Sequence, residues 1–160
     1  MVAEGTRPGS LSARLAATTR VLVVEDDADI ADFLRAYFRA AGYDVVHVDP
    51  TSVDEGLAAV RANRPDVVLL DLWLRGFSGL QLYRRIRSHD ELDAVPVVVL
   101  PADTAARSRA EPMATGIDGF VPKPFKAEAL RDLVAGRLAA ARELLERGTV
   151  DPGSGALSAA

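Results

Sequence analysis

The sequence of 160 residues contains no cysteine. Disulfide frameworks, thiol nucleophiles and thiolate metal sites are therefore excluded, and oxygen ligands remain for a metal ion. The sequence also lacks an apolar run of about 20 residues, the length that a membrane-spanning helix needs. Residues 1–19 carry scattered Arg and Ser in place of the continuous apolar segment of a signal peptide. We therefore expect a cytoplasmic protein that makes no membrane contact.

An excess of basic residues is missing as well. The formal net charge is −4 at pH 7 and the sequence pI is about 5.2, whereas a nucleic-acid-binding surface usually needs a basic face. We expect no direct nucleic-acid binding by this chain. What is present is an ordinary globular composition, with 49% apolar and 26% charged residues. The length fits one domain.

The chain divides into three parts by composition. Residues 1–19 are rich in Gly, Ser, Thr and Ala and predict a flexible N-terminal tail. Residues 20–147 form the predicted domain, which ends in a long helix. Residues 148–160 are again rich in Gly, Ser and Ala, and predict either a flexible tail or the start of a truncated output domain.

Apolar runs alternate with segments of helical periodicity throughout the predicted domain. The expected strands are 21–24, 43–48, 67–70, 95–100 and 118–121, and the expected helices are 30–38, followed by Gly42 as a C-cap, and 53–61, 79–87, 104–114 and 126–147. The fourth helix is expected to be short or mobile, because Pro112 removes a backbone donor there. Strands that alternate with helices predict an α/β fold with a five-stranded parallel sheet and helices on both faces.

Charged side chains follow three of the predicted strands. Glu25 and Asp26 end the first strand, Asp71 ends the third, and Lys123 follows the fifth. Ligands of open parallel sheets bind beyond the carboxyl ends of the strands, so these side chains are expected to converge. Carboxylates packed together repel one another, and Mg²⁺ with oxygen ligands relieves this repulsion. An aspartate at such a site can attack phosphorus and form an acyl phosphate.

At these residues the sequence resembles the response-regulator receiver family over about Arg20 to Leu138. The resemblance is carried by the segments Val21–Asp27, Asp66–Leu74, Thr115–Phe120 and Lys123–Phe125. It implies a doubly wound, flavodoxin-like fold with strand order 2-1-3-4-5. It also implies a two-component signalling domain, phosphorylated by a sensor histidine kinase or a His-phosphotransfer protein, that is not a conventional enzyme.

The resemblance also assigns roles to individual residues. It implies that Asp71 is the phosphoacceptor and that Glu25, Asp26, Asp71 and the backbone carbonyl of Trp73 hold Mg²⁺. Lys123 would contact the phosphoryl oxygens, and its peptide bond to Pro124 would be cis. Phe120 occupies the position of the aromatic residue that turns inward on activation.

The sequence departs from the family pattern at the end of the fourth strand. Pro101 and Ala102 follow this strand, where the family has a Thr or Ser whose hydroxyl bonds the phosphoryl group. A hydrogen bond to a charged group contributes about 1.5 to 3 kcal/mol, so we expect coupling between phosphorylation and shape change to weaken roughly ten- to a hundredfold. The backbone N–H of Ala102 remains as a donor. The alternative function is therefore an atypical receiver, a docking or dimerisation module with weak switching.

Two features lie near the end of the chain. The last helix carries apolar residues at helical spacing past Leu138, which predicts either packing on its own domain or a homodimer through paired helices. Residues 150–157 weakly resemble the opening of GGDEF-type diguanylate cyclase domains. The alternative for this segment is a flexible tail.

Two other classes share parts of this pattern. Haloacid-dehalogenase-like phosphatases use an aspartate nucleophile with Mg²⁺ but need a second acid two residues later, where this sequence has Trp73. Flavodoxin-like cofactor binders need a phosphate-binding loop of Ser, Thr and Gly after the first strand. Here the acidic segment 25–27 would repel a phosphate, so both classes are disfavoured.

Overall fold

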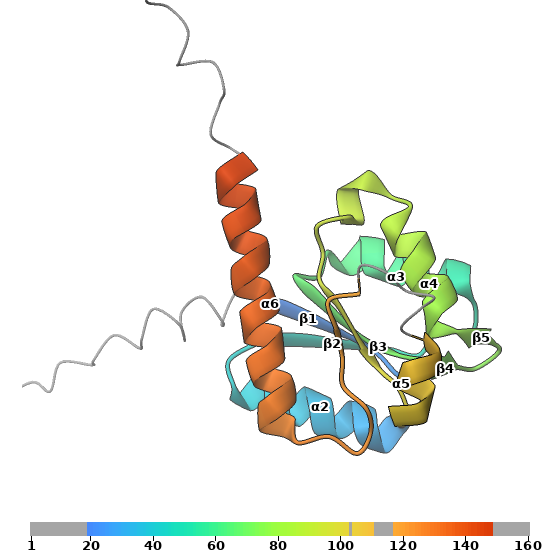
Figure 1. Ribbon diagram of the computed structural model, residues 1–160. Helices are drawn as coiled ribbons and strands as arrows, with labels where there is room; N and C mark the ends of the chain where they lie inside the picture. Colours follow the sequence, from blue (N-terminus) through green and yellow to red (C-terminus); the bar gives the residue numbers. More distant parts are fainter. Residues whose placement is uncertain (1–18, 103, 111–116, 149–160) are drawn as a thin grey trace, which may run out of the picture.

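The computed structural model describes residues 19–102, 104–110 and 117–148. A central sheet is covered by helices on both faces (Figure 1). Its strands are β1 (Arg20–Val24), β2 (Asp44–Val48), β3 (Val67–Asp71), β6 (Val97–Leu100) and β7 (Gly119–Phe120). The order is β2-β1-β3-β6-β7 and every pairing is parallel. This confirms the predicted sheet and its order 2-1-3-4-5.

Neighbouring residues of β1 enter two different cores. Val21 and Val23 pack into one apolar cluster, while Leu22 and Val24 pack into the other. Successive side chains of a strand point to opposite faces, so a strand buried on both faces must be apolar throughout. The continuous run Val21–Val24 has this property, and all four residues are 0% exposed.

The helices supply the outer sides of these two cores. Residues from α2 (Ala28–Ala40) and α6 (Ala127–Gly148) complete one core. Residues from α3 (Val53–Asn63), α4 (Gly79–Arg87) and α5 (Thr104–Ala110) complete the other. The doubly wound architecture therefore follows from the burial of both sheet faces.

Helix ends have local causes in the sequence. The side chain of Asp27 caps α2 by accepting hydrogen bonds from the backbone N–H groups of Asp29 (3.0 Å) and Ile30 (3.2 Å). Gly42, predicted to follow this helix in a left-handed conformation, has φ 96°. Ser78 is the N-cap residue of α4 and forms a capping box with Gln81. The first residue of α4, Gly79, lies against the backbone of Asp71, so α4 starts near the end of β3.

Some elements differ from the sequence prediction. A small hairpin of β4 (Trp73–Leu74) and β5 (Phe77–Ser78), and a 3₁₀ turn, η1 (Asp90–Leu92), were not predicted. Strands of two residues are too short to show the alternation of apolar and polar residues by which a strand is predicted. The structure describes α5 only for Thr104–Ala110, so the remainder of the predicted helix 104–114, including Pro112, lies outside the described residues. The same holds for residues 1–18 and 149–160 of the predicted tails.

The last helix is longer than its core requires. Leu130, Val134 and Leu138 are buried against the sheet, whereas Leu144 and Leu145 are 69% and 60% exposed. The predicted long helix of 126–147 is thus confirmed in α6, which ends at Gly148. Across the described residues, every helix is either too short or too polar to cross a membrane.

Candidate functional site

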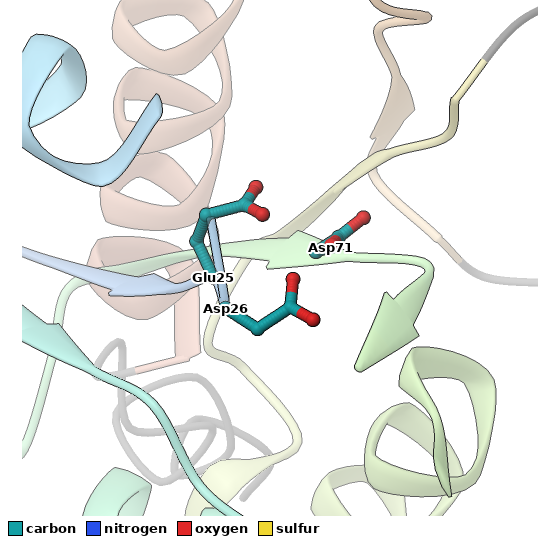
Figure 2. Close-up of side chains that lie close together, drawn as sticks. All are labelled: Glu25, Asp26 and Asp71. Atoms are coloured by element: carbon teal, nitrogen blue, oxygen red, sulfur yellow. The ribbon is translucent and has the colours of Figure 1, made fainter. Parts of the chain in front are cut away.

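The ends of β1 and β3 bring three carboxylates together. Asp71 is the last residue of β3, and Glu25 and Asp26 directly follow β1. The residues come from adjacent parallel strands, since Val24 is paired with Leu70. One carboxylate oxygen from each lies within 4.8 Å of the others, and Figure 2 shows the three groups gathered at this edge of the sheet. The predicted convergence of these acids is confirmed.

Glu25 is the most deeply buried of the three acids, at 1% exposure. Its Oε1 accepts a hydrogen bond from the backbone N–H of Asp27 at 3.2 Å. Its backbone is held on the other side by β2, where the Nε2 atom of His47 lies 2.8 Å from the Glu25 carbonyl oxygen. These contacts fix the position of a carboxylate that has almost no access to solvent.

Lys123 enters the same site from the segment after β7. Its Nζ lies 3.0 Å from Oε2 of Glu25 and 3.3 Å from Oδ1 of Asp71. Its backbone N–H donates a hydrogen bond of 2.8 Å to the carbonyl oxygen of Pro101, at the end of β6. The peptide bond from Lys123 to Pro124 is cis, as the sequence predicted.

Burial changes the ionisation of Asp71 and Lys123. Desolvation, assisted by the negative charge of Glu25, raises the pKa of Asp71 from 3.8 to about 7 although Lys123 opposes the shift. Burial alone would lower the pKa of Lys123. The hydrogen bond to Glu25 and the charges of both acids outweigh this, so the pKa of Lys123 is raised. The lysine is therefore a cation at neutral pH.

The donor set fits Mg²⁺. Three carboxylates share the site with one ammonium group, and such an excess of buried negative charge favours a hard divalent cation with oxygen ligands. Burial of Asp71, and next the negative charge of Glu25, disfavour the ionised form and raise the pKa of Asp71, and a bound cation would oppose both effects. The backbone N–H of Trp73 lies 3.5 Å from Oδ1 of Asp71, which places this residue beside the acids. That its carbonyl is a ligand stays a prediction.

The residues predicted to act in switching lie around the ends of β6 and β7. Pro101 is buried and Ala102 is exposed. Ala102, Lys123 and Pro124 line a surface cavity of about 480 Å³ that also borders on α2. Phe120 is half-buried in β7, and the guanidinium carbon of Arg107 lies 5.9 Å from the centre of its ring. The roles of these residues stay predictions.

Sequence reasoning missed Gly79, the first residue of α4. A Cβ placed on Gly79 would overlap the backbone carbonyl oxygen of Asp71 and would lie 3.2 Å from Cα of Leu72. The backbone N–H of Gly79 also donates a 2.7 Å hydrogen bond to the Leu72 carbonyl oxygen. The lack of a side chain at Gly79 therefore lets the start of α4 approach the backbone of Asp71. A glycine that starts a helix soon after a strand-end aspartate was the available signal.

We expect Gly79→Ala to displace the backbone of Asp71 and to destabilise the fold by about 1 to 3 kcal/mol, as overpacking against backbone does. Mg²⁺ binding, followed by titration, should weaken in the same variant. Gly136→Ala is the control, because a Cβ at Gly136 meets no atom within 4 Å. Urea unfolding should show this control to be neutral or slightly stabilised. Equal stability of the two variants would contradict the proposed crowding.

The sequence profile of the family described as response regulator receiver domain matches residues 21–135. The chain belongs to this family. Receivers are signalling phosphoacceptors rather than conventional enzymes, and the cluster of Glu25, Asp26 and Asp71 is consistent with their phosphorylation site and typical of their Mg²⁺ site. Receiver domains interact with histidine kinases.

Several curated proteins are similar to this receiver. DNA-binding response regulator MtrA of Mycobacterium tuberculosis (strain ATCC 25618 / H37Rv) is 38% identical over 119 residues, which cover 74% of this chain and 50% of the relative. Response regulator MprA of Mycolicibacterium vanbaalenii is 35% identical over 136 residues, which cover 85% of this chain and 54% of the relative. The chain thus spans about half the length of these relatives.

Solved receivers have the same fold. A signal receiver domain from Vibrio parahaemolyticus, of a LuxO repressor protein, gives a TM-score of 0.69 at 27% identity, over 80% of this chain and 97% of that chain. The receiver domain of a sensor histidine kinase of Pseudomonas aeruginosa PAO1 gives a TM-score of 0.67 at 25% identity, over 76% of this chain and 98% of that chain. That structure is described with a magnesium ion coordinated in its active site cleft.

These comparisons give no evidence for the GGDEF resemblance of residues 150–157. That segment also lies outside the described residues. The family assignment therefore concerns the receiver alone.

Proposed function

We propose that this receiver accepts a phosphoryl group on Asp71 in a Mg²⁺-dependent reaction, with a sensor histidine kinase or a His-phosphotransfer protein as donor. One observation carries the proposal. The buried Asp71 carboxylate lies within 4.8 Å of oxygens of Glu25 and Asp26, and 3.3 Å from the ammonium group of Lys123. Carboxylates that can hold a metal ion, together with an ammonium group beside Asp71, support the proposal, because both cations would stabilise a negatively charged phosphoryl group next to a nucleophilic aspartate.

Each residue has a role in this proposal. An oxygen of Asp71 forms a bond to phosphorus while the bond from phosphorus to the donor nitrogen breaks, and the histidine of the donor retains the electron pair. No separate general base is needed once Asp71 is ionised, and a bound Mg²⁺ would favour that form over the protonated one. Mg²⁺, held by Glu25, Asp26, Asp71 and the Trp73 carbonyl, would supply charge neutralisation for the phosphoryl oxygens. Lys123 provides a second positive charge beside Asp71.

The proposal is distinguished from phosphatase chemistry by residue 73. A haloacid-dehalogenase-like reaction needs a carboxylic acid two residues after the nucleophile. Trp73 stands there, and its exposed indole ring has no carboxylic acid proton to transfer to a leaving group. We therefore propose phosphoryl acceptance and slow self-dephosphorylation as the chemistry of this chain, without turnover of a small substrate.

The single tryptophan provides a direct test, because Trp73 lies beside Asp71. We expect its fluorescence to change on addition of Mg²⁺ and to change again with beryllofluoride, a phosphoryl mimic. In Asp71→Asn the second change should be absent, because the mimic binds to the aspartate oxygen. A wild-type protein that responds to neither addition would contradict the proposal.

Pro101 favours a second candidate function, a docking module that phosphorylation changes only weakly. The residue is buried, has no N–H group and carries no hydroxyl to bond a phosphoryl oxygen. Amide hydrogen exchange with and without beryllofluoride separates the two candidates. Slowed exchange over 117–121 in the presence of the mimic supports the switching receiver, whereas unchanged exchange with the mimic bound supports the docking module.

The exposed leucines of α6 underlie the proposal of a homodimer. We expect the double variant Leu144→Glu, Leu145→Glu to remain folded and to be monomeric, because both side chains are mostly exposed within one chain. Light scattering after size-exclusion chromatography measures the mass of each protein. A wild-type protein that stays monomeric at high concentration would contradict pairing through this helix. No nucleic-acid contact is proposed for this chain.

A further inference from the structure

A second cavity, separate from the acidic cluster, lies between the β4–β5 hairpin, the first turns of α4, and α5. Figure 1 shows these elements side by side at one end of the molecule. The cavity has a volume of about 850 Å³, within the range of about 300 to 1,000 Å³ typical of binding pockets. It begins at Leu72, the residue after Asp71, but Glu25, Asp26 and Lys123 do not line it.

The floor of this cavity is apolar. The apolar residues on one side are Leu72, Leu74 and Leu80, and those on the other are Ala106 and Ala110 of α5. All five are buried but border on the open space. The two alanines are small, which leaves room between α5 and the hairpin. A bulky apolar side chain of a partner would therefore be desolvated on both sides if it entered here.

The rim of the cavity is aromatic and cationic. Trp73 is 61% exposed at the rim. Arg84 of α4 and Arg109 of α5 are exposed and line the same cavity, and none of the described residues that line it is acidic. This local positive charge contrasts with the formal net charge of −4 for the chain. The rim is thus complementary to an anionic partner.

We propose that this cavity is a docking surface for an acidic segment of a partner protein, with a bulky apolar residue that fills the apolar floor. Exposed tryptophan and arginine around a desolvated pocket are the residues that dominate binding energy in protein interfaces. Trp73 extends the surface beyond the cavity, which suits a polypeptide better than a small molecule. A carboxylate of the segment would pair with the exposed guanidinium group of Arg109.

Docking at this cavity would be a further function of the chain, and it does not depend on phosphorylation of Asp71. One wall of the cavity is formed by Leu72 and Trp73, which follow Asp71 at the end of β3. The other wall is α5, the helix that comes after β6 in the chain. A partner bound here would contact the segments that follow two of the central strands. Binding is therefore tested on the unphosphorylated protein, so that it is independent of Asp71 chemistry.

The test is an unbiased selection from a random peptide library on the immobilised, unphosphorylated chain. Peptides enriched in Asp or Glu and in Leu, Phe or Trp are expected. Arg109→Glu should weaken their binding by about tenfold or more, as the loss and reversal of a desolvated charge pair does. Arg137→Glu on α6 makes the same charge change outside the cavity and should leave binding unchanged. Bound peptide should also change the fluorescence of Trp73.

Three results would overturn the docking surface: a selection that yields no binder, binders without acidic residues, or binders that retain their affinity for Arg109→Glu. Arg109 is exposed, and circular dichroism verifies that the variant is folded. Arg109→Glu should still be phosphorylated by acetyl phosphate with Mg²⁺. Failure of the docking surface is thereby separated from failure of the phosphoacceptor proposal.

Discussion

Asp71→Asn should abolish formation of an acyl phosphate when the protein is incubated with Mg²⁺ and acetyl phosphate. The carboxylate oxygen of Asp71 is the proposed nucleophile, and an uncharged amide cannot replace it. Glu25 and Asp26 lie close by, but Glu25 is 1% exposed and already bonded to Lys123 at 3.0 Å. Intact-mass spectrometry should show the addition of one phosphoryl group to the wild-type chain and none to the variant.

Asp54→Asn is the matched control for this experiment. Asp54 is on α3, and its side chain is 82% exposed in an ion pair with Arg85. The substitution removes the same charge from an exposed side chain outside the acidic cluster and should leave phosphorylation unchanged. Phosphorylation of Asp71→Asn to the wild-type level would show that another residue is the acceptor, and the proposed function would be wrong.

Asp71→Asn should also stabilise the metal-free protein at about pH 8. The pKa of Asp71 is raised to about 7 in the folded chain, from 3.8, first by desolvation and then by the charge of Glu25. The folded state therefore binds the proton more tightly than the unfolded state. Stability is greatest below the unfolded pKa and is lost as the pH rises from about 4 to about 7. A shift of this size corresponds to about 4 kcal/mol at most.

Urea unfolding of both proteins in a chelator, at about pH 4 and about pH 8, measures this effect. The two proteins should differ little in stability at the lower pH, because Asp71 is protonated in the folded state and still about half protonated in the unfolded state. The variant should be more stable by several kcal/mol at the higher pH. Mg²⁺ should reverse this order by stabilising only the wild type strongly. A wild type that gains stability relative to the variant between the two pH values, without metal, would contradict the burial of this charge.

The sheet could be predicted from the sequence because its strands are buried on both faces. The runs of residues 21–24 and 67–70 are continuously apolar, and the structure gives both as central strands. The strand order came from the family resemblance, and the parallel pairing of β1 with β2 and β3 confirms it. The hairpin of Trp73 to Ser78 was not predicted, because its register depends on only two residue pairs.

The acidic cluster was also predictable, since parallel strands end at one edge of a sheet. Glu25, Asp26, Asp71 and Lys123 lie together as the strand ends required. The crowding around Gly79 could not be predicted from the sequence, because it results from the approach of α4 to the backbone of β3. The cavity between Arg84 and Arg109 was missed for a similar reason, as it depends on how far α5 lies from the hairpin.

The hydrogen bond from the Lys123 N–H group to the Pro101 carbonyl oxygen, 2.8 Å long, involves only main-chain atoms. Any residue at position 101 offers the same oxygen, so the lysine keeps its anchor whichever side chain follows the fourth parallel strand. If the family resemblance holds at this position, proline in place of the usual Thr or Ser would remove a hydroxyl group but would leave the main-chain contact that positions Lys123 beside the acids.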